Sequence, residues 1–416
     1  MRCEVPVPGR PAIVLDDGVL APHRSQFDTL GETTRTRLAY AATRIVMQDG
    51  YASVPHSLAS PGSSADIAAA VDWTATLELR RRLDGLGFAI AEAMDTAQRF
   101  DIGWNTAREL IERCGALRLA NGFVAGAGTD HLPGVESEDA LVDAVVHQAR
   151  VIQEAGGEVI LLPLPWLCSR GYGAGDFVRV YDRIIARLEG PLYVHWLGAM
   201  FLPSLAGYFP EDSFRRVMDL DPAKVRGAKL SLLDGPLEVR LRREIAANDQ
   251  ILLTGDDFHF ARLILGGDLE GRPSHIKARG AVTIGSREVA TGDFSHALLG
   301  VLDGIAEPAA LALRALDAGD HETYLAIMEP CEELGRWLFQ SPTRHYKAGL
   351  AFLSWLNGHQ DQPMLANHEE RSRDIPHYIH AAELASRAGV LRDAELVAER
   401  LERWLATHSW SNSAKG

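Results

Sequence analysis

Eight short apolar runs, separated by longer amphipathic stretches, are the feature that most limits the fold of this chain. Several runs are almost continuously apolar, which is typical of parallel strands covered on both faces. The stretches between them have apolar residues at spacings of three and four, as amphipathic helices do. The runs begin at Thr43, Gly87, Leu117, Glu158, Pro191, Val225, Gln250 and Gly280.

This alternation predicts an α/β fold, namely a (β/α)8 TIM barrel. Eight strand–helix units within about 250 residues have the size of such a barrel. An open doubly wound sheet is the alternative, but the G-x-G-x-x-G turn that usually follows its first strand is missing. One predicted helix illustrates the pattern, since it opens with the N-cap candidate Ser137 and stops at Gly156-Gly157.

Strand-like runs cease near residue 296, and helical patterns continue beyond that point. We therefore expect three parts in the 416 residues: an N-terminal extension (1–40), the (β/α)8 barrel (41–295) and an additional C-terminal helical region (296–416). The helical region is expected to pack on the barrel or to serve in assembly.

Composition and charge exclude several classes of protein. The net charge is −14 without long basic runs, which argues against nucleic acid and anionic membranes as partners. No apolar run approaches the roughly 20 residues that cross a bilayer. The first residues lack the pattern of a secretory signal, and the four cysteines are far apart, without a C-x-x-C pair. We expect a cytoplasmic protein with a small-molecule partner.

Catalytic groups of such barrels lie at the C-terminal ends of the strands and in the loops that follow. The predicted strand ends place one lysine, one histidine, several carboxylates and two tryptophans on this face. The candidates are Asp95, Thr96, Trp166, His195, Trp196, Lys229, Ser231, Asp256 and Asp257.

Lys229 is the candidate with the most specific chemistry. A free lysine has a pKa of about 10.4 and is a poor nucleophile at neutral pH. Desolvation at an apolar barrel mouth would lower that pKa, so that the neutral amine attacks a carbonyl and forms a Schiff base. The alternative is a structural lysine whose ammonium pairs with Asp234 or Asp256, and spacing alone does not separate the two.

Two other groups also have two interpretations each. His195 suits proton transfer, because its unperturbed pKa is near 6.5, but it also suits a hydrogen-bonded place in the core. The segment "TGDDFHF" suits a divalent metal, but we favour a helix cap in which Asp256 or Asp257 accepts backbone N–H bonds. A metal site in this barrel would draw its ligands from Glu92, Asp95, His195, Asp257 and His259.

From about Val71 to Gly358 the order of motifs resembles the dihydrodipicolinate synthase / N-acetylneuraminate lyase family of class I aldolases. The family's G-T-T-G-E turn after the second strand reads M-D-T-A-Q here, which keeps Thr96. "VRGAKLSLLDG" matches the sixth strand, on which Lys229 falls at the Schiff-base lysine. "GPLYVHWLG" matches the fifth strand, with His195 at the place of the catalytic tyrosine.

Other motifs fit the family or depart from it. "ILLTGDDFHFARLILGG" is close to the seventh strand, and "SPTRHYKAGLAFLSWLNG" resembles the late helix. The family's P-P-Y-Y becomes Leu164-Pro165-Trp166-Leu167, and Met200 stands near the place of an arginine that many members carry. We therefore interpret the chain as a divergent, uncharacterised branch of this family, in which the use of pyruvate is open.

The resemblance implies a cofactor-free lyase, an aldolase or hydro-lyase, that acts on a small oxo-acid or an oxidised sugar, in a homo-oligomer. Lys229 would form the iminium, and His195 would relay protons while Thr96 positions it or the substrate. Substrate contacts would come from Asp95, Trp166, Trp196, Ser231, Asp256 and Asp257. The alternatives are a metal-dependent sugar isomerase or epimerase, and a barrel that has lost catalysis and serves as a binding protein.

Overall fold

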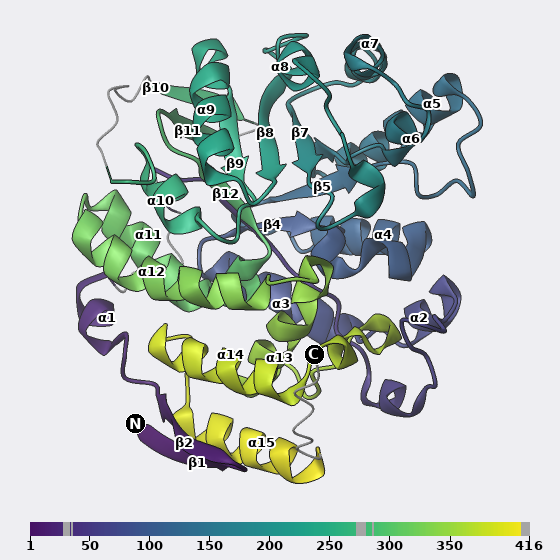
Figure 1. The fold of residues 1–416 in the computed structure, drawn as a ribbon. Helices are drawn as coiled ribbons and strands as arrows, with labels where there is room; N and C mark the ends of the chain where they lie inside the picture. Colours follow the sequence, from purple (N-terminus) through teal and green to yellow (C-terminus); the bar gives the residue numbers. More distant parts are fainter. Residues whose placement is uncertain (28–33, 35, 272–279, 285–286, 409–416) are drawn as a thin grey trace.

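The computed structural model describes residues 1–27, 34, 36–271, 280–284 and 287–408. Its centre is a closed parallel barrel in the order β12-β3-β4-β5-β6-β7-β8-β9, which confirms the predicted (β/α)8 fold (Figure 1). The strands are β3 (Ala39–Ala42), β4 (Ala89–Glu92), β5 (Phe123–Ala127), β6 (Glu158–Leu161), β7 (Leu192–Leu197), β8 (Val225–Ser231), β9 (Ile251–Thr254) and β12 (His296–Leu299).

The prediction of the eighth strand was wrong. The run at Gly280 forms an antiparallel hairpin of β10 (Gly280–Ile284) and β11 (Arg287–Thr291), while β12 closes the barrel between β9 and β3. The barrel thus extends beyond the predicted boundary at 295, and its first strand begins before residue 41. The hairpin buries alternate apolar residues against the lower barrel interior, and Arg287 bonds to Glu158 and the Tyr40 hydroxyl.

Helices surround the barrel because each carries an apolar face toward the strands. As predicted, α5 has the Ser137 hydroxyl as its N-cap and ends before Gly156, whose φ is 81°. The barrel helices are α2 (Ser64–Ala69), α3 (Trp73–Gly85), α4 (Arg99–Ala116), α5 (Glu138–Glu154), α6 (Pro165–Ser169), α7 (Ala174–Ile185), α8 (Ser213–Met218), α9 (Gly235–Ile245) and α10 (Phe260–Leu265).

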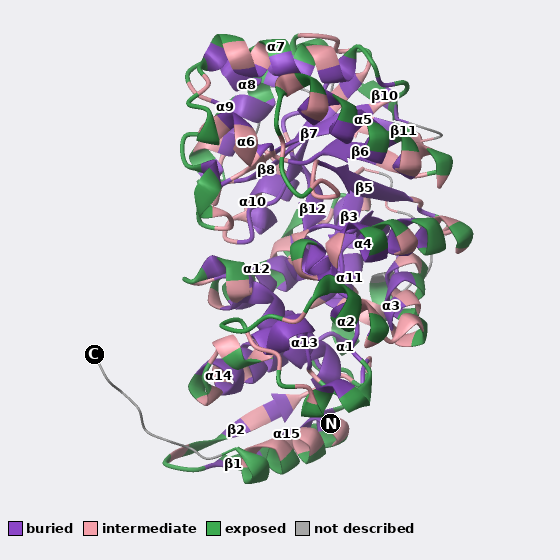
Figure 2. Cartoon of the chain, turned by 90° about the vertical axis from the view of Figure 1, so that its right-hand side faces the viewer, coloured by how far each residue is buried: buried purple, intermediate pink, exposed green. Residues whose placement is uncertain are grey.

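The C-terminal helices lie across the end of the barrel toward which β7 and β8 point (Figure 1). They are α11 (Ala306–Asp317), α12 (His321–Leu338), α13 (Tyr346–Leu356), α14 (Ile375–Arg387) and α15 (Ala394–Thr407). Every residue of α13 is buried, and Figure 2 shows this helix between α12 and α14. The C-terminal region is therefore part of the core and not an appendage.

The N-terminal segment packs on the same helices. The hairpin of β1 (Arg2–Val7) and β2 (Arg10–Asp16) contacts α15 and α14, and α1 (Ala21–Phe27) contacts α11. Short 3-10 turns connect many elements, namely η1 (Asp49–Ser53), η2 (Asp95–Ala97), η3 (Pro203–Leu205), η4 (Ala246–Asn248), η5 (Val301–Asp303), η6 (Thr343–His345) and η7 (Ala366–Ser372). No helix among the described residues combines the length and the apolar composition that a bilayer crossing needs.

A fully buried ion pair joins α3 to the barrel. The Arg80 guanidinium donates to both carboxylate oxygens of Glu92, each at 2.8 Å. We expect Glu92→Gln to lower the free energy of unfolding by about 3–5 kcal/mol, because it leaves the guanidinium charge buried and unpaired. Urea unfolding measures this loss.

The control is Glu109→Gln, which breaks an exposed pair with Arg113 on α4. Its effect should stay within about 1 kcal/mol, as for other surface ion pairs. Equal effects of the two variants would contradict a structural role for the buried pair.

Candidate active site

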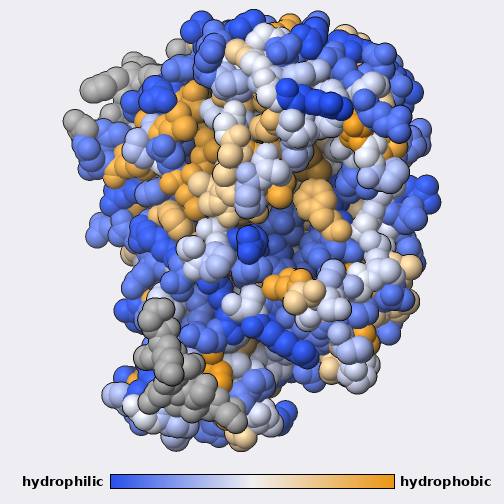
Figure 3. All heavy atoms as spheres, turned by 45° about the vertical axis from the view of Figure 1, so that its right-hand side comes forward, coloured by the Kyte–Doolittle hydropathy of each residue, from blue (hydrophilic) through white to orange (hydrophobic). Residues whose placement is uncertain are grey.

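A cavity of about 320 Å³ opens at the C-terminal ends of the barrel strands. Apolar side chains form much of its wall, among them Leu162, Phe201 and Phe339, and the buried Lys229 and His195 also line it. Figure 3 shows apolar side chains gathered on the barrel half of this face, above a mostly hydrophilic C-terminal part. A small, mainly apolar cavity with a few polar groups is typical of a small-molecule site.

Lys229 lies near the end of β8, the sixth barrel strand, with 9% of its surface exposed. Burial lowers the pKa of its amine to about 8, and the carboxylates of Asp257 and Asp95 offset this only in part. Among the described residues, no carboxylate lies within ion-pairing distance of its Nζ. The two partners suggested by the sequence are engaged elsewhere, since Asp234 caps α9 and Asp256 bonds to His259.

His195 is next to Lys229 in the β7–β8 register and also lines the cavity. Its Nε2 lies 3.3 Å from the Ser231 hydroxyl, and its Nδ1 is buried without a partner among the described residues. Burial and then the nearby Lys229 hold the pKa of His195 well below its usual range. The imidazole is therefore neutral at physiological pH.

Thr96 contacts a tyrosine and not His195, so the predicted positioning of His195 is not seen, and a role of Thr96 toward the substrate stays a prediction. Its hydroxyl lies 2.8 Å from that of Tyr346, the first residue of α13, and both residues line the cavity. Burial, with the nearby Asp95, raises the pKa of the Tyr346 phenol, so the phenol stays protonated. No role was predicted for Tyr346, although it lies in "HYKAGLAFLSWLNG", part of the segment that resembles the family's late helix.

Two carboxylates complete the polar part of the cavity. Asp257 is buried, accepts a hydrogen bond from the Val301 N–H at 3.3 Å, and has a pKa raised well above its usual range by burial. The Asp95 carboxylate is 39% exposed and pairs with Lys347 at 3.2 Å. Asp95 and Asp257 therefore both line the cavity, and their contact with a substrate stays a prediction.

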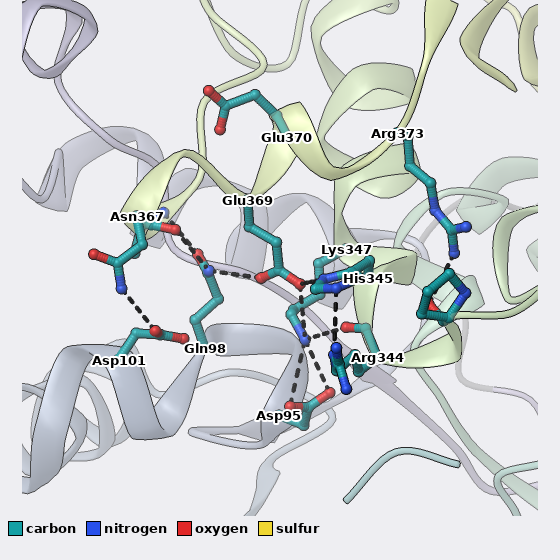
Figure 4. A network of polar contacts seen from close by, with 12 residues as sticks. Asp95, Gln98, Asp101, Arg344, His345, Lys347, Asn367, Glu369, Glu370 and Arg373 are labelled. Atoms are coloured by element: carbon teal, nitrogen blue, oxygen red, sulfur yellow. Dashed lines mark hydrogen bonds and ion pairs between the residues drawn. The ribbon is translucent and has the colours of Figure 1, made fainter. Parts of the chain in front are cut away.

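A buried polar network holds the C-terminal region against the barrel rim (Figure 4). Lys347 pairs with Asp95, and with Glu369 at 3.6 Å. Glu369 also accepts from Gln98 at 2.9 Å and contacts His345 at 3.0 Å. Tyr346 and Lys347 therefore bind the adjacent rim residues Thr96 and Asp95, which fixes the first turn of α13 over the cavity.

Three predicted substrate contacts lie outside the cavity. Trp196 faces the helices, where its ring is 5.0 Å from Phe214, because alternate residues of β7 point to opposite sides. Trp166 donates from Nε1 to the Val135 carbonyl at 2.9 Å. Asp256 accepts from the N–H groups of the two residues before α10, as the cap interpretation predicted. These three residues do not line the cavity.

The suggested metal ligands are not brought together. Glu92 is fully engaged by Arg80, and His259 bonds to Asp256 at 3.0 Å, away from His195 and Asp257. Among the described residues, no cluster of three His, Cys, Asp or Glu side chains has a metal-binding arrangement. The metal-dependent interpretation therefore has no ligand set here.

Solved structures share this fold at low sequence identity. A putative dihydrodipicolinate synthetase from Pseudomonas aeruginosa is 13% identical, with a TM-score of 0.58 over 85% of this chain and 99% of that chain. YagE, a prophage protein of the dihydrodipicolinic acid synthase family from E. coli K12, solved with pyruvate, is 10% identical, with a TM-score of 0.57 and the same coverage. The sialic acid aldolase of Ruminococcus gnavus is 14% identical, with a TM-score of 0.54 over 85% and 97% of the two chains. The predicted resemblance is thus confirmed at the level of the fold.

A family model described as "Protein of unknown function (DUF993)" matches residues 19–409. A comparison with curated proteins gave no match. The family match includes both the barrel and the C-terminal helices that close the cavity.

The network on α13 gives a test of how the cavity is closed. Lys347→Met leaves the Asp95 and Glu369 carboxylates without their shared cation, so we expect a loss of about 3–5 kcal/mol of stability. Hydrogen exchange should speed up in the first turn of α13 and remain unchanged in α5. The matched control, Arg403→Met, removes an exposed ion pair with Glu399. It should change neither the stability nor the exchange rate in α13. Unchanged exchange at α13 in Lys347→Met would contradict this role.

Proposed function

This chain belongs to the DUF993 family, and we propose that it is a Schiff-base-forming lyase, a class I aldolase or hydro-lyase, acting on a small oxo-acid or an oxidised sugar. The observation that carries the proposal is the buried Lys229 amine, with a pKa lowered to about 8, in the wall of a small cavity. The fold that this chain shares with a solved sialic acid aldolase at 14% identity supports this proposal.

The first step uses Lys229 as the nucleophile. Near neutral pH an appreciable fraction of the amine is uncharged, and its lone pair adds to the substrate carbonyl carbon. A proton passes from the nitrogen to the oxygen, a second proton is taken up from solvent, water leaves, and a cationic iminium remains. The cavity favours this step because it holds the amine dry and next to the bound carbonyl.

The second step breaks the bond to the neighbouring fragment. A base removes a proton from the leaving fragment's hydroxyl, the C–C bond pair flows into the iminium, and an enamine forms. Reprotonation of the enamine carbon and hydrolysis then release the second product and free Lys229. In a hydro-lyase the same iminium instead makes the α-proton acidic, and the β-hydroxyl leaves as water.

The hydroxyls of Tyr346 and Thr96 suit this proton transfer. They form a 2.8 Å hydrogen bond inside the cavity, so one hydroxyl can accept a proton while the other donates one. His195, expected from the sequence to relay protons, has a pKa lowered so far by burial that it is a weak base. We assign it the role of a neutral hydrogen-bonding group that works with Ser231.

Reductive trapping tests the proposed function. Protein incubated with a panel of ketones, 2-oxo acids and keto sugars in cyanoborohydride should gain the mass of one reduced adduct, mapped to Lys229. Lys229→Arg should abolish the adduct, whereas Lys224→Arg, the same change at a partly exposed lysine of the same chain, should not. Absence of an adduct over the whole panel, or an adduct only at Lys224, would contradict the proposal.

Tyr346→Phe separates Schiff-base formation from proton transfer. The variant keeps Lys229, so trapping should persist. Exchange of the ketone's α-protons with deuterated water, followed by NMR, should fall by about 10²–10⁴-fold, the usual contribution of a positioned proton donor. Phe339→Leu, a change in the apolar wall beside Tyr346, is the control and should retain most of the exchange. Full exchange in Tyr346→Phe would rule out the tyrosine as the relay.

A further inference from the structure

The cavity around Lys229 contains more acidic than basic side chains. Its lining includes the carboxyl groups of Asp95, Asp130 and Asp257 but, among these described lining residues, only Arg99 and Lys229 as cationic side chains. In the proposed function Lys229 is consumed by the Schiff base. Apart from the iminium itself, Arg99 is then the only cationic side chain among the described lining residues that could pair with a negative charge on the substrate.

Arg99 has no donor left for a substrate. A guanidinium has five N–H donors. Those of Arg99 go to the two Asp130 oxygens at 2.8 and 2.9 Å, to the Gln148 side chain at 2.7 Å, and to the Ala93 and Gly126 carbonyls at 3.1 and 2.7 Å. A substrate carboxylate could bind Arg99 only by displacing one of these buried partners.

The iminium already has a counter-ion in the protein. Asp257 is buried in the same cavity wall, where burial raises the pKa of its carboxyl and lowers that of the Lys229 amine, while the attraction between the two groups opposes both shifts only in part. Once the nitrogen carries a fixed positive charge, Asp257 can ionise and balance it. A carboxylate on the carbon next to the iminium would add a second, unpaired negative charge in an enclosed space, which is costly.

Uncharged hydroxyl groups, in contrast, would meet suitable partners. The Nδ1 of His195 is buried in the cavity wall without a partner among the described residues, and a buried polar atom in this state is costly. The hydroxyls of Ser231 and Thr129 also line the cavity, as does the partly exposed Asp95 carboxylate. Each of these groups can donate a hydrogen bond to a substrate hydroxyl or accept one from it, and none of these bonds requires a charged substrate.

From these contacts we infer that the carbonyl compound bound by Lys229 is a neutral hydroxylated ketone or aldehyde, such as a keto sugar, and not a 2-oxo acid. This inference rests on the proposed Schiff-base function and narrows its substrate class. In this account the preference for a neutral substrate over a 2-oxo acid comes from Asp257. Its carboxylate supplies the negative charge that a 2-oxo acid would otherwise bring.

Hydroxyacetone and pyruvate form a matched pair of probes, because both are methyl ketones. Beside the carbonyl, hydroxyacetone carries a neutral hydroxymethyl group and pyruvate carries a carboxylate. At pH 8, with cyanoborohydride, we expect half-maximal labelling of Lys229 at a concentration of hydroxyacetone at least about tenfold below that of pyruvate. Intact mass gives the extent of labelling, peptide mapping gives the site, and labelling of Lys224 corrects for non-specific reaction.

Asp257→Asn tests the cause of the preference. Without its carboxylate, the iminium can use the carboxylate of pyruvate as counter-ion, so the preference for hydroxyacetone should shrink or reverse. Asp139→Asn, at an exposed carboxylate on α5, is the control and should leave it unchanged.

The outcomes distinguish the two proposals. Equal or better labelling of Lys229 by pyruvate would overturn the inference and leave the Schiff-base function standing. An unchanged preference in Asp257→Asn would overturn the counter-ion argument. Labelling of Lys229 by neither probe would count against the proposed function itself, and the inference would fail with it.

Discussion

Desolvation of the Lys229 amine is the constraint on which the rest of the site depends. A lysine in water is charged and chemically inert at neutral pH, so reactivity requires a place where the ammonium is disfavoured. Among the residues that the structure describes, two lysines are buried, with opposite effects on their pKa values. Carboxylates in direct contact with Lys347 outweigh burial and raise its pKa, whereas Lys229 lacks an ion-pair partner among the described residues and burial prevails.

The C-terminal helices maintain that dry environment. Two consecutive residues of α13 bind two consecutive residues of the rim, one pair through hydroxyl groups and the other through an ion pair. The ion pair holds the helix in place, and the hydroxyl pair brings the Tyr346 phenol to the cavity wall. A single turn of α13 therefore both covers the cavity and places a hydroxyl group in its wall.

Much of this arrangement could be predicted from the sequence, and the failures have physical causes. Strand periodicity and motif order placed Lys229, His195 and Asp257 at one barrel end, where the cavity contains them. The strand β12 has only four residues and lies in an Ala- and Leu-rich segment that reads as helix. Trp196 was assigned to the wrong face because the phase of β7 depends on its neighbours. Tyr346 was missed because its position above the barrel is a tertiary contact without a local signal.

The most direct measurement is the titration of the lysine amines by NMR, in protein labelled with 13C at the lysine ε-carbons. The chain has five lysines, Lys224, Lys229, Lys277, Lys347 and Lys415, so single substitutions can assign each signal. Our account predicts that the Lys229 signal titrates near pH 8, while that of Lys347 remains protonated beyond its usual range. A Lys229 signal that titrates near 10.4, like a lysine in water, would contradict it.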